Sequence, residues 1–129
     1  MTIIEGKRVR DQVLEDQALF INIEKRGLLV IVGCAHAGII NTLEHALTVT
    51  GVKKLYGFIG GTHLIRPKED KLNETIKKLK GYDLKLIAPS HCTGHKSMMV
   101  LNQTFPEAFV LNYTGRTIDT SKKLKDKVF

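Results

Sequence analysis

The sequence predicts an α/β fold, in which helices pack on a sheet, because two kinds of apolar pattern alternate along it. Short apolar runs of strand length are followed by stretches whose apolar residues recur at helical spacing. The clearest pair is the run LLVIV at 28–32 and the segment 38–50, where Ile39, Leu43 and Ala46 fall on one helical face. The predicted order is ββαβαβαβ, and a chain of 129 residues suits one domain with one hydrophobic core.

The first two predicted strands form a β-hairpin. Residues 17–23 are mostly apolar in both alternating sets, which indicates a strand covered on both faces, and Lys25, Arg26 and Gly27 make the turn into the run at 28–32. Residues 1–15 are polar without a clear period and are predicted to be a loop or an edge strand, whereas 121–129 form a charged tail. The remaining predicted elements are a helix at 38–50 stopped by Gly51, a strand at 54–59, a helix through Leu72, Ile76 and Leu79 closed by Gly81, a strand at 84–88 ended by Pro89, a helix at 93–105 with Thr93 as its N-cap, a strand at 108–111 and a candidate strand at 116–119.

Charge and composition narrow the function classes. The net charge is +7, and the favoured interpretation of the basic residues is a solvated surface; attraction to an anionic substrate such as a phosphate ester is the sharper alternative. Nucleic-acid binding is the weakest interpretation of the basic residues, because few aromatic side chains are present to stack on bases. The basic residues cluster at Lys7, Arg8 and Arg10, at Lys77, Lys78 and Lys80, and at Lys122, Lys123, Lys125 and Lys127.

Location is predicted to be cytoplasmic. No apolar run reaches the roughly 18 residues of a membrane span, and the first ten residues contain no apolar segment of a signal peptide. The two cysteines, Cys34 and Cys92, are too few for a disulfide framework.

Three histidines occupy equivalent places after three predicted strands. His36 follows the run at 28–32, His63 follows the strand at 54–59, and His91 follows the strand at 84–88, each among small residues. A single histidine at a strand end is more often structural. Three that follow strands of one sheet can meet at one edge, where ligands bind in open α/β sheets, and neutral imidazole is a good ligand for zinc and iron.

The ordered segments GCAHAGIINT, GGTHL, PSHCTG and NYTGRTI, preceded by DQAL at 16–19, carry a family resemblance over residues 16–118. Together they resemble the branch of the metallo-β-lactamase superfamily that includes dihydropterin-ribofuranosylaminobenzene-phosphate-synthase-like proteins. The resemblance implies the C-terminal half of an αββα sandwich, so that 1–129 form a single partial domain. It also implies one or two divalent metal ions in the complete fold, most simply zinc, with iron or manganese as alternatives.

The resemblance assigns metal-ligand roles to His36, His63 and His91. His36 matches the ligand of the motif GCSHAG, here with Ala35 in place of serine, and His91 matches the last ligand, in HCTG. His63 lies where many members place a bridging aspartate. The catalytic residue stays unknown, and a water activated by the metal is expected to be the nucleophile.

Three further residues are assigned to the surroundings of the metal or to the substrate side: Cys34, Cys92 and Thr93. Cys34 follows a buried strand and is expected to pack as a small apolar residue, and Cys92 adjoins His91, where it would tune the site. Direct binding of the metal by either thiolate is the weaker alternative. His45 and His95 are expected to be surface or packing residues.

The motif HxHxDH, which supplies most ligands in the superfamily, does not occur in this sequence. We therefore expect a fragment of a longer protein, with a half-domain completed by a partner and a degenerate member as alternatives. The function that the resemblance implies is metal-dependent hydrolysis or group transfer on a small, phosphorylated or pterin-like anionic substrate. The alternatives are a non-catalytic half-domain that binds a metal or a partner, through a homodimer or a separate N-terminal half, and a nucleic-acid-processing protein of the same superfamily.

Overall fold

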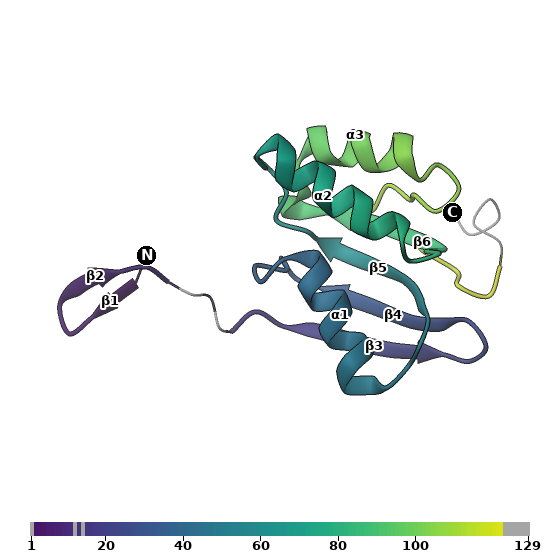
Figure 1. Cartoon of the computed structure of the whole chain (residues 1–129), viewed down its shortest axis with the longest axis horizontal. Coiled ribbons are helices and arrows are strands. Elements are labelled where there is room, and N and C mark those ends of the chain that lie inside the picture. The colour runs from purple at the N-terminus through teal and green to yellow at the C-terminus, as the bar shows by residue number, and fades with distance from the viewer. Residues whose placement is uncertain (1, 12, 14, 123–129) are drawn as a thin grey trace.

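The computed structural model describes residues 2–11, 13 and 15–122, and Figure 1 shows a small hairpin standing apart from a sheet covered by helices. The sheet has the strand order β3-β4-β5-β6. β3 is antiparallel to β4, whereas β4, β5 and β6 are mutually parallel. The elements are β1 (Thr2–Ile4), β2 (Lys7–Val9), β3 (Ala18–Ile23), β4 (Gly27–Val32), α1 (Ile39–Thr50), β5 (Leu55–Gly61), α2 (Glu69–Lys80), β6 (Leu86–Ser90), the short 3-10 helix η1 (His91–Thr93) and α3 (His95–Thr104).

The predicted α/β layout is confirmed between β3 and α3, and the element order differs at both ends. Residues 2–9 were predicted to be a loop or an edge strand, but they form the two-stranded antiparallel sheet of β1 and β2. The predicted strand at 108–111 is a single parallel bridge from Phe109 to Ile87 on the free side of β6. The candidate strand at 116–119 is not a named strand, although Ile118 packs against the sheet.

Pro89 was predicted to end its strand, and this was wrong, because it lies inside β6. The amide of Ile87 points to the outer side of β6, where it donates to Ala108 O at 2.8 Å. Two residues later Pro89 faces the same side, where the bridge at Phe109 has already ended. Among the described residues no partner there requires an amide proton, so proline is tolerated in this edge position.

All three helices lie on one face of the sheet (Figure 1). They enclose the main core, whose members include Val30 and Phe58 from the sheet, Leu43 from α1, Leu79 from α2 and Leu101 from α3. Among the described residues, no helix is both long and apolar enough to cross a membrane.

The opposite face of the sheet has a thinner cover. Leu29, Tyr56, Leu86 and Ala88 form a second cluster there, covered in part by Val110 and Ile118 of the C-terminal segment. On β3 the cover ends, and Leu19 and Ile21 are 58% and 39% exposed. This face therefore presents apolar side chains to solvent beside its buried cluster.

Close backbone approach in the centre of the sheet depends on glycine. A Cβ at Gly57 would lie 2.0 Å from Leu86 O, and one at Gly60, where φ is +122°, would lie 1.9 Å from Val32 O. Gly61 is packed equally closely, because a Cβ there would lie 2.6 Å from Gly33 O and 2.7 Å from Cys92 Sγ. These contacts keep the ends of β4, β5 and β6 close together.

We expect Gly60→Ala to lower the free energy of unfolding by about 3 kcal/mol or more, because the new methyl group collides with backbone at a left-handed position. Gly115→Ala is the matched control, since φ is +86° there and nothing lies within 4 Å of the new Cβ. It should cost only about 1 kcal/mol. Urea unfolding followed by circular dichroism measures both, and equal losses would contradict the close approach at Gly60.

Candidate metal centre

Three loops that carry histidines meet at one edge of the sheet, because β4, β5 and β6 run parallel and end on the same side. His36 follows β4, His63 follows β5 and His91 directly follows β6. This edge is the one nearer the N-terminal hairpin in Figure 1. The predicted convergence of the three loops is thus present.

Each of the three loops contains a residue with a strained backbone. Ala35, His63 and His91 are non-glycine residues with φ of 52°, 51° and 50°. A left-handed conformation costs roughly 1–2 kcal/mol for such a residue. Such strain persists only where the surrounding structure holds the residue in place, and it is common at functional sites.

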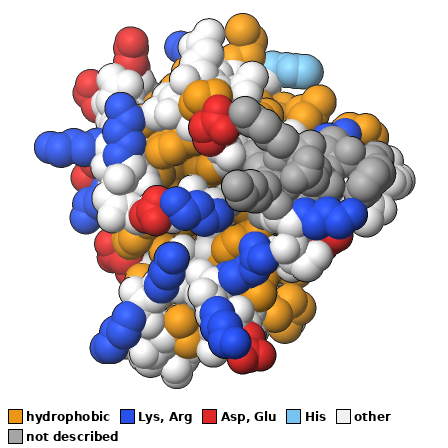
Figure 2. Space-filling view, turned by 90° about the vertical axis from the view of Figure 1, so that its right-hand side faces the viewer, with side chains coloured by type: hydrophobic (Ala, Val, Ile, Leu, Met, Phe, Trp, Pro, Cys, Tyr) orange, Lys and Arg blue, Asp and Glu red, His pale blue; other side chains and the backbone are white. Residues whose placement is uncertain are grey.

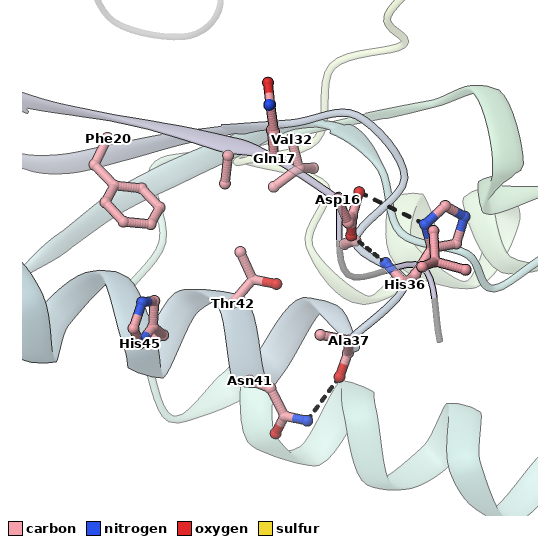
Figure 3. Close-up of a pocket in the computed structure, with 12 residues that line it drawn as sticks. Asp16, Gln17, Phe20, Val32, His36, Ala37, Asn41, Thr42 and His45 are labelled. Carbon is pink, nitrogen blue, oxygen red and sulfur yellow. Dashed lines mark hydrogen bonds and ion pairs between the residues drawn. The ribbon is translucent and has the colours of Figure 1, made fainter. Parts of the chain in front are cut away.

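Asp16 holds His36 in place (Figure 3). The backbone amide of His36 donates to Asp16 Oδ2 at 2.6 Å, and the ring Nδ1 lies 3.6 Å from Oδ1. The rings of His36 and His63 meet edge to face, with centroids 4.8 Å apart and planes at 71°. Asp16 thereby fixes one of two adjacent imidazoles, a role that the sequence motif at 16–19 did not reveal.

His91 lies beside the two cysteines. Its Nε2 is 3.1 Å from Cys34 Sγ, and the possible ligand atoms of Cys34, His91 and Cys92 all lie within 4.8 Å of one another. Cys92 Sγ also accepts the amide of His63 at 3.2 Å and contacts Cys34 O at 3.6 Å. Burial raises the pKa of the Cys34 thiol above its usual value, with further increases from the hydrogen bond and charge of Cys92 and the charge of Asp16.

The predicted ligands therefore divide into two neighbouring groups. His36 and His63 contact each other, whereas in the part of the chain that the structure describes the atoms close enough to share one ion are those of Cys34, His91 and Cys92. A single centre of three histidines stays a prediction. The expectation that His45 and His95 lie at the surface agrees with their exposure; the ring of His45 meets that of Phe20 edge to face.

Thr93 was predicted to cap a helix, and this was wrong, because Gly94 is the N-cap of α3 and makes no side-chain cap. The fully buried Thr93 hydroxyl donates instead to Ser90 O at 2.8 Å. It also accepts from the amide of Thr62 at 3.2 Å and from the Thr62 hydroxyl at 3.0 Å. This network ties η1 to the end of β5, next to His63.

Two hollows adjoin His36. One of about 560 Å³ lies between β3 and α1, with Asp16, Phe20 and His45 along its wall (Figure 3). A smaller one of about 150 Å³ is lined by His36, His63 and Lys71, among others. Lys71 was not singled out by the sequence, because its charge is one of many on the solvated side of α2.

The donor atoms at this edge fit a borderline divalent metal. Imidazole nitrogens, a carboxylate and thiols are the groups that bind zinc, and imidazole also suits iron. His36, His63 and His91 are all exposed, so an ion in solution can reach them. The exposure is compatible with loading of a metal after folding.

The chain is similar in sequence to known proteins. The search of protein-family models found no match. The chain is 36% identical over 113 residues to 7,8-dihydropterin-6-methyl-4-(β-D-ribofuranosyl)-aminobenzene-5'-phosphate synthase of Methanocaldococcus jannaschii, covering 88% of this chain and 38% of the relative. It is 37% identical over 116 residues to an uncharacterised protein of the same organism, covering 90% and 41%. The chain thus spans about two fifths of the length of these curated relatives.

The chain also shares its fold with part of a solved structure. The crystal structure of a metal-dependent hydrolase of the β-lactamase superfamily superposes with a TM-score of 0.79 and 27% identity, over 88% of this chain and 43% of that one. The chain therefore corresponds to part of a metallo-β-lactamase-superfamily protein, as its motifs indicated. Within that superfamily it is related to the dihydropterin-ribofuranosylaminobenzene-phosphate synthase named above.

We expect the free energy of unfolding to be about 1 kcal/mol higher for His63→Gly than for His63→Ala, because glycine adopts the left-handed backbone without strain. The same pair at His45, inside α1, should show the opposite sign and a similar size, because glycine destabilises a helix interior. Urea unfolding of the four variants measures both differences. A more stable alanine variant at both positions would contradict a strained loop at His63.

We expect Thr93→Val to cost about 2 kcal/mol of unfolding free energy, because it leaves the buried amide of Thr62 and the carbonyl of Ser90 without their partner. Thr48→Val on the exposed side of α1 removes only a bond to Glu44 O within the helix, and should change the unfolding free energy by less than about 0.5 kcal/mol. Thermal and urea unfolding of the two variants compare the costs. A loss at Thr93 no larger than at Thr48 would show that the network contributes no stability.

Proposed function

We propose that this chain supplies part of the metal centre of a metal-dependent hydrolase or group-transfer enzyme that acts on a small, phosphorylated or pterin-like substrate. The observation that carries the proposal is the convergence of His36, His63 and His91 on one sheet edge, at backbone positions of which two are strained. Strained backbone is common at functional sites, which supports a metal centre at this edge. Likeness to a metal-dependent hydrolase supports the same chemistry.

Each residue of the proposed metal centre has its own role. His36, His63 and His91 would hold the ion, which when bound supplies a Lewis acid and lowers the pKa of a water ligand. Asp16 orients His36 through its amide and its ring, as carboxylates behind metal-binding histidines commonly do. Thr93 fixes the loop of His63 to η1. Zinc is the simplest choice for this donor set, with iron or manganese as alternatives.

An anionic substrate is supported by Lys71 rather than by the clusters of basic residues. Lys71 lines the small hollow beside His36 and His63, where its ammonium group would neutralise a phosphate. Lys77, Lys78 and Lys80 lie in the last turn of α2, which runs back towards the opposite end of the sheet. Figure 2 views that opposite end, where lysine and arginine side chains are spread over the surface. The name of the related synthase, which contains a ribofuranosyl phosphate and a dihydropterin, favours the same substrate class.

The outer face of the sheet also needs a protein segment to cover it. Leu19 and Ile21 are exposed beside the buried cluster of Leu29 and Leu86, and exposed apolar surface next to a core favours a protein contact. We propose that a further half-domain covers this face, since well over half of each relative lies outside the matched region. A non-catalytic module that binds a metal or a partner is the second candidate, and the same exposed face supports it.

Metal content is the first test. We expect the purified chain to retain close to one equivalent of zinc, iron or manganese by elemental analysis, and a His36→Ala/His91→Ala double variant to retain almost none. Loss of a ligand should weaken binding by at least about 100-fold. His45→Ala is the matched control, because His45 lies inside α1 rather than in a loop at the sheet edge, and it should leave the metal content unchanged.

Activity separates the two candidates. If the chain, mixed with the N-terminal half of a relative, hydrolyses a phosphate ester such as bis(p-nitrophenyl) phosphate in proportion to its metal content, the enzyme assignment is supported. Metal binding without such activity would favour the non-catalytic module. Equal metal loss in the double variant and in the His45 control would overturn the assignment of ligands.

A further inference from the structure

Two cysteines and one histidine from different loops converge at the same sheet edge. Cys34 lies between β4 and α1, whereas His91 and Cys92 lie in η1, after β6. We propose that Cys34, His91 and Cys92 form a thiolate-containing site for a soft or borderline cation such as Zn²⁺, which this chain fills without any other protein. The site shares His91 with the proposed histidine centre but includes neither His36 nor His63, so ligation by sulfur can be tested separately from the hydrolytic function.

The distances suit one ion. All three ligand atoms lie within 4.8 Å of one another, and His91 Nε2 is only 3.1 Å from Cys34 Sγ. In a tetrahedral zinc site with metal–ligand bonds of 2.0–2.3 Å, neighbouring ligand atoms are separated by roughly 3.5–3.8 Å. Small side-chain rotations therefore bring the three atoms to binding separation, and a water molecule can occupy the fourth position.

One backbone contact favours Cys92 as a thiolate ligand. Cys92 Sγ accepts the backbone amide of His63 at 3.2 Å, and a hydrogen bond to a charged acceptor is stronger than one to a neutral acceptor. When the ion binds, the two thiols release their protons to solvent, and the contact from Cys92 Sγ to Cys34 O gives way to the metal bond.

The backbone holds the ligands in this arrangement. His91 keeps a left-handed conformation with φ of 50°, which places its ring towards Cys34. Gly61 allows Cys92 to approach, because a Cβ there would lie 2.7 Å from the sulfur. Both cysteines are half-buried and His91 is exposed, so the ion has a path from solvent.

Cobalt titration of the reduced, metal-free chain tests the site, because only thiolate ligation produces an intense sulfur-to-cobalt charge-transfer band in the near ultraviolet. We expect the band in the unmodified chain and in His36→Ala. We expect Cys34→Ser and Cys92→Ser each to weaken the band, because one of the two thiolates is lost, and to lower the affinity for Co²⁺ at least about tenfold. Far-ultraviolet circular dichroism checks that the variants are folded.

A second measurement needs no variant. Zn²⁺ should protect both thiols of the native chain from a disulfide reagent such as dithionitrobenzoate, and a chelator should restore their reaction. Co²⁺ bound without the charge-transfer band, with both thiols still reactive, would overturn the thiolate site and leave the histidine centre intact. A band of unchanged intensity in both Cys34→Ser and Cys92→Ser, or no binding of either ion, would also overturn it.

Discussion

Parallel pairing of β4, β5 and β6 is the constraint on which the rest of the structure depends. Parallel strands must end on the same side of a sheet, and the loops that follow them share one edge. Pairing this close requires Gly57 and Gly60, where a larger residue would strike the neighbouring backbone. The chemistry-bearing residues meet because the strands before them cannot end anywhere else.

The loops at this edge are held by polar contacts that offset their strained backbone. The buried Thr93 hydroxyl joins Ser90 and Thr62, and Ser97 of α3 donates to Leu64 O at 2.6 Å. A net hydrogen bond is worth about 1 kcal/mol, whereas an unpaired buried group costs about 1–3 kcal/mol. A few such contacts therefore balance left-handed residues that cost roughly 1–2 kcal/mol each. His63 and His91 can keep their conformations without a metal, so the edge is organised in advance of binding.

Periodicity predicted the central elements well, because their apolar residues are committed to one core. Leu43 and Ala46 on α1 and Val30 on β4 all lie in it. The predictions failed where the pairing of strands, rather than burial of side chains, decides the structure. The strand expected at 108–111 is one bridge, and Pro89 remains in β6 because its outer neighbour ends too early to need its amide. Sequence periodicity contains no information on where a neighbouring segment stops.

The site was predictable to the level of its loops but not of its contacts. Histidines after three strands indicated a shared edge, and the strands indeed place them there. Which side chains touch depends on backbone angles that the motifs do not state. The left-handed turn at His91 brings its ring to Cys34, so a cysteine expected to pack as an apolar residue contacts an imidazole instead. Asp16 is similar, because its bond to the His36 amide joins residues on either side of a hairpin.

Position and coverage leave this edge of the sheet, with its histidines, open to solvent. The helices protect one face of the sheet, and the C-terminal segment protects much of the other, but the loops after β4, β5 and β6 remain open to solvent. Lysines at the far end of α2 keep the protein solvated, whereas Lys71 lies beside the histidines. Nitrogen, oxygen and sulfur donors thus stand at an accessible edge on a rigid sheet. Two of the backbone positions that present them, His63 and His91, are strained although both side chains are exposed, and strained backbone is common at functional sites.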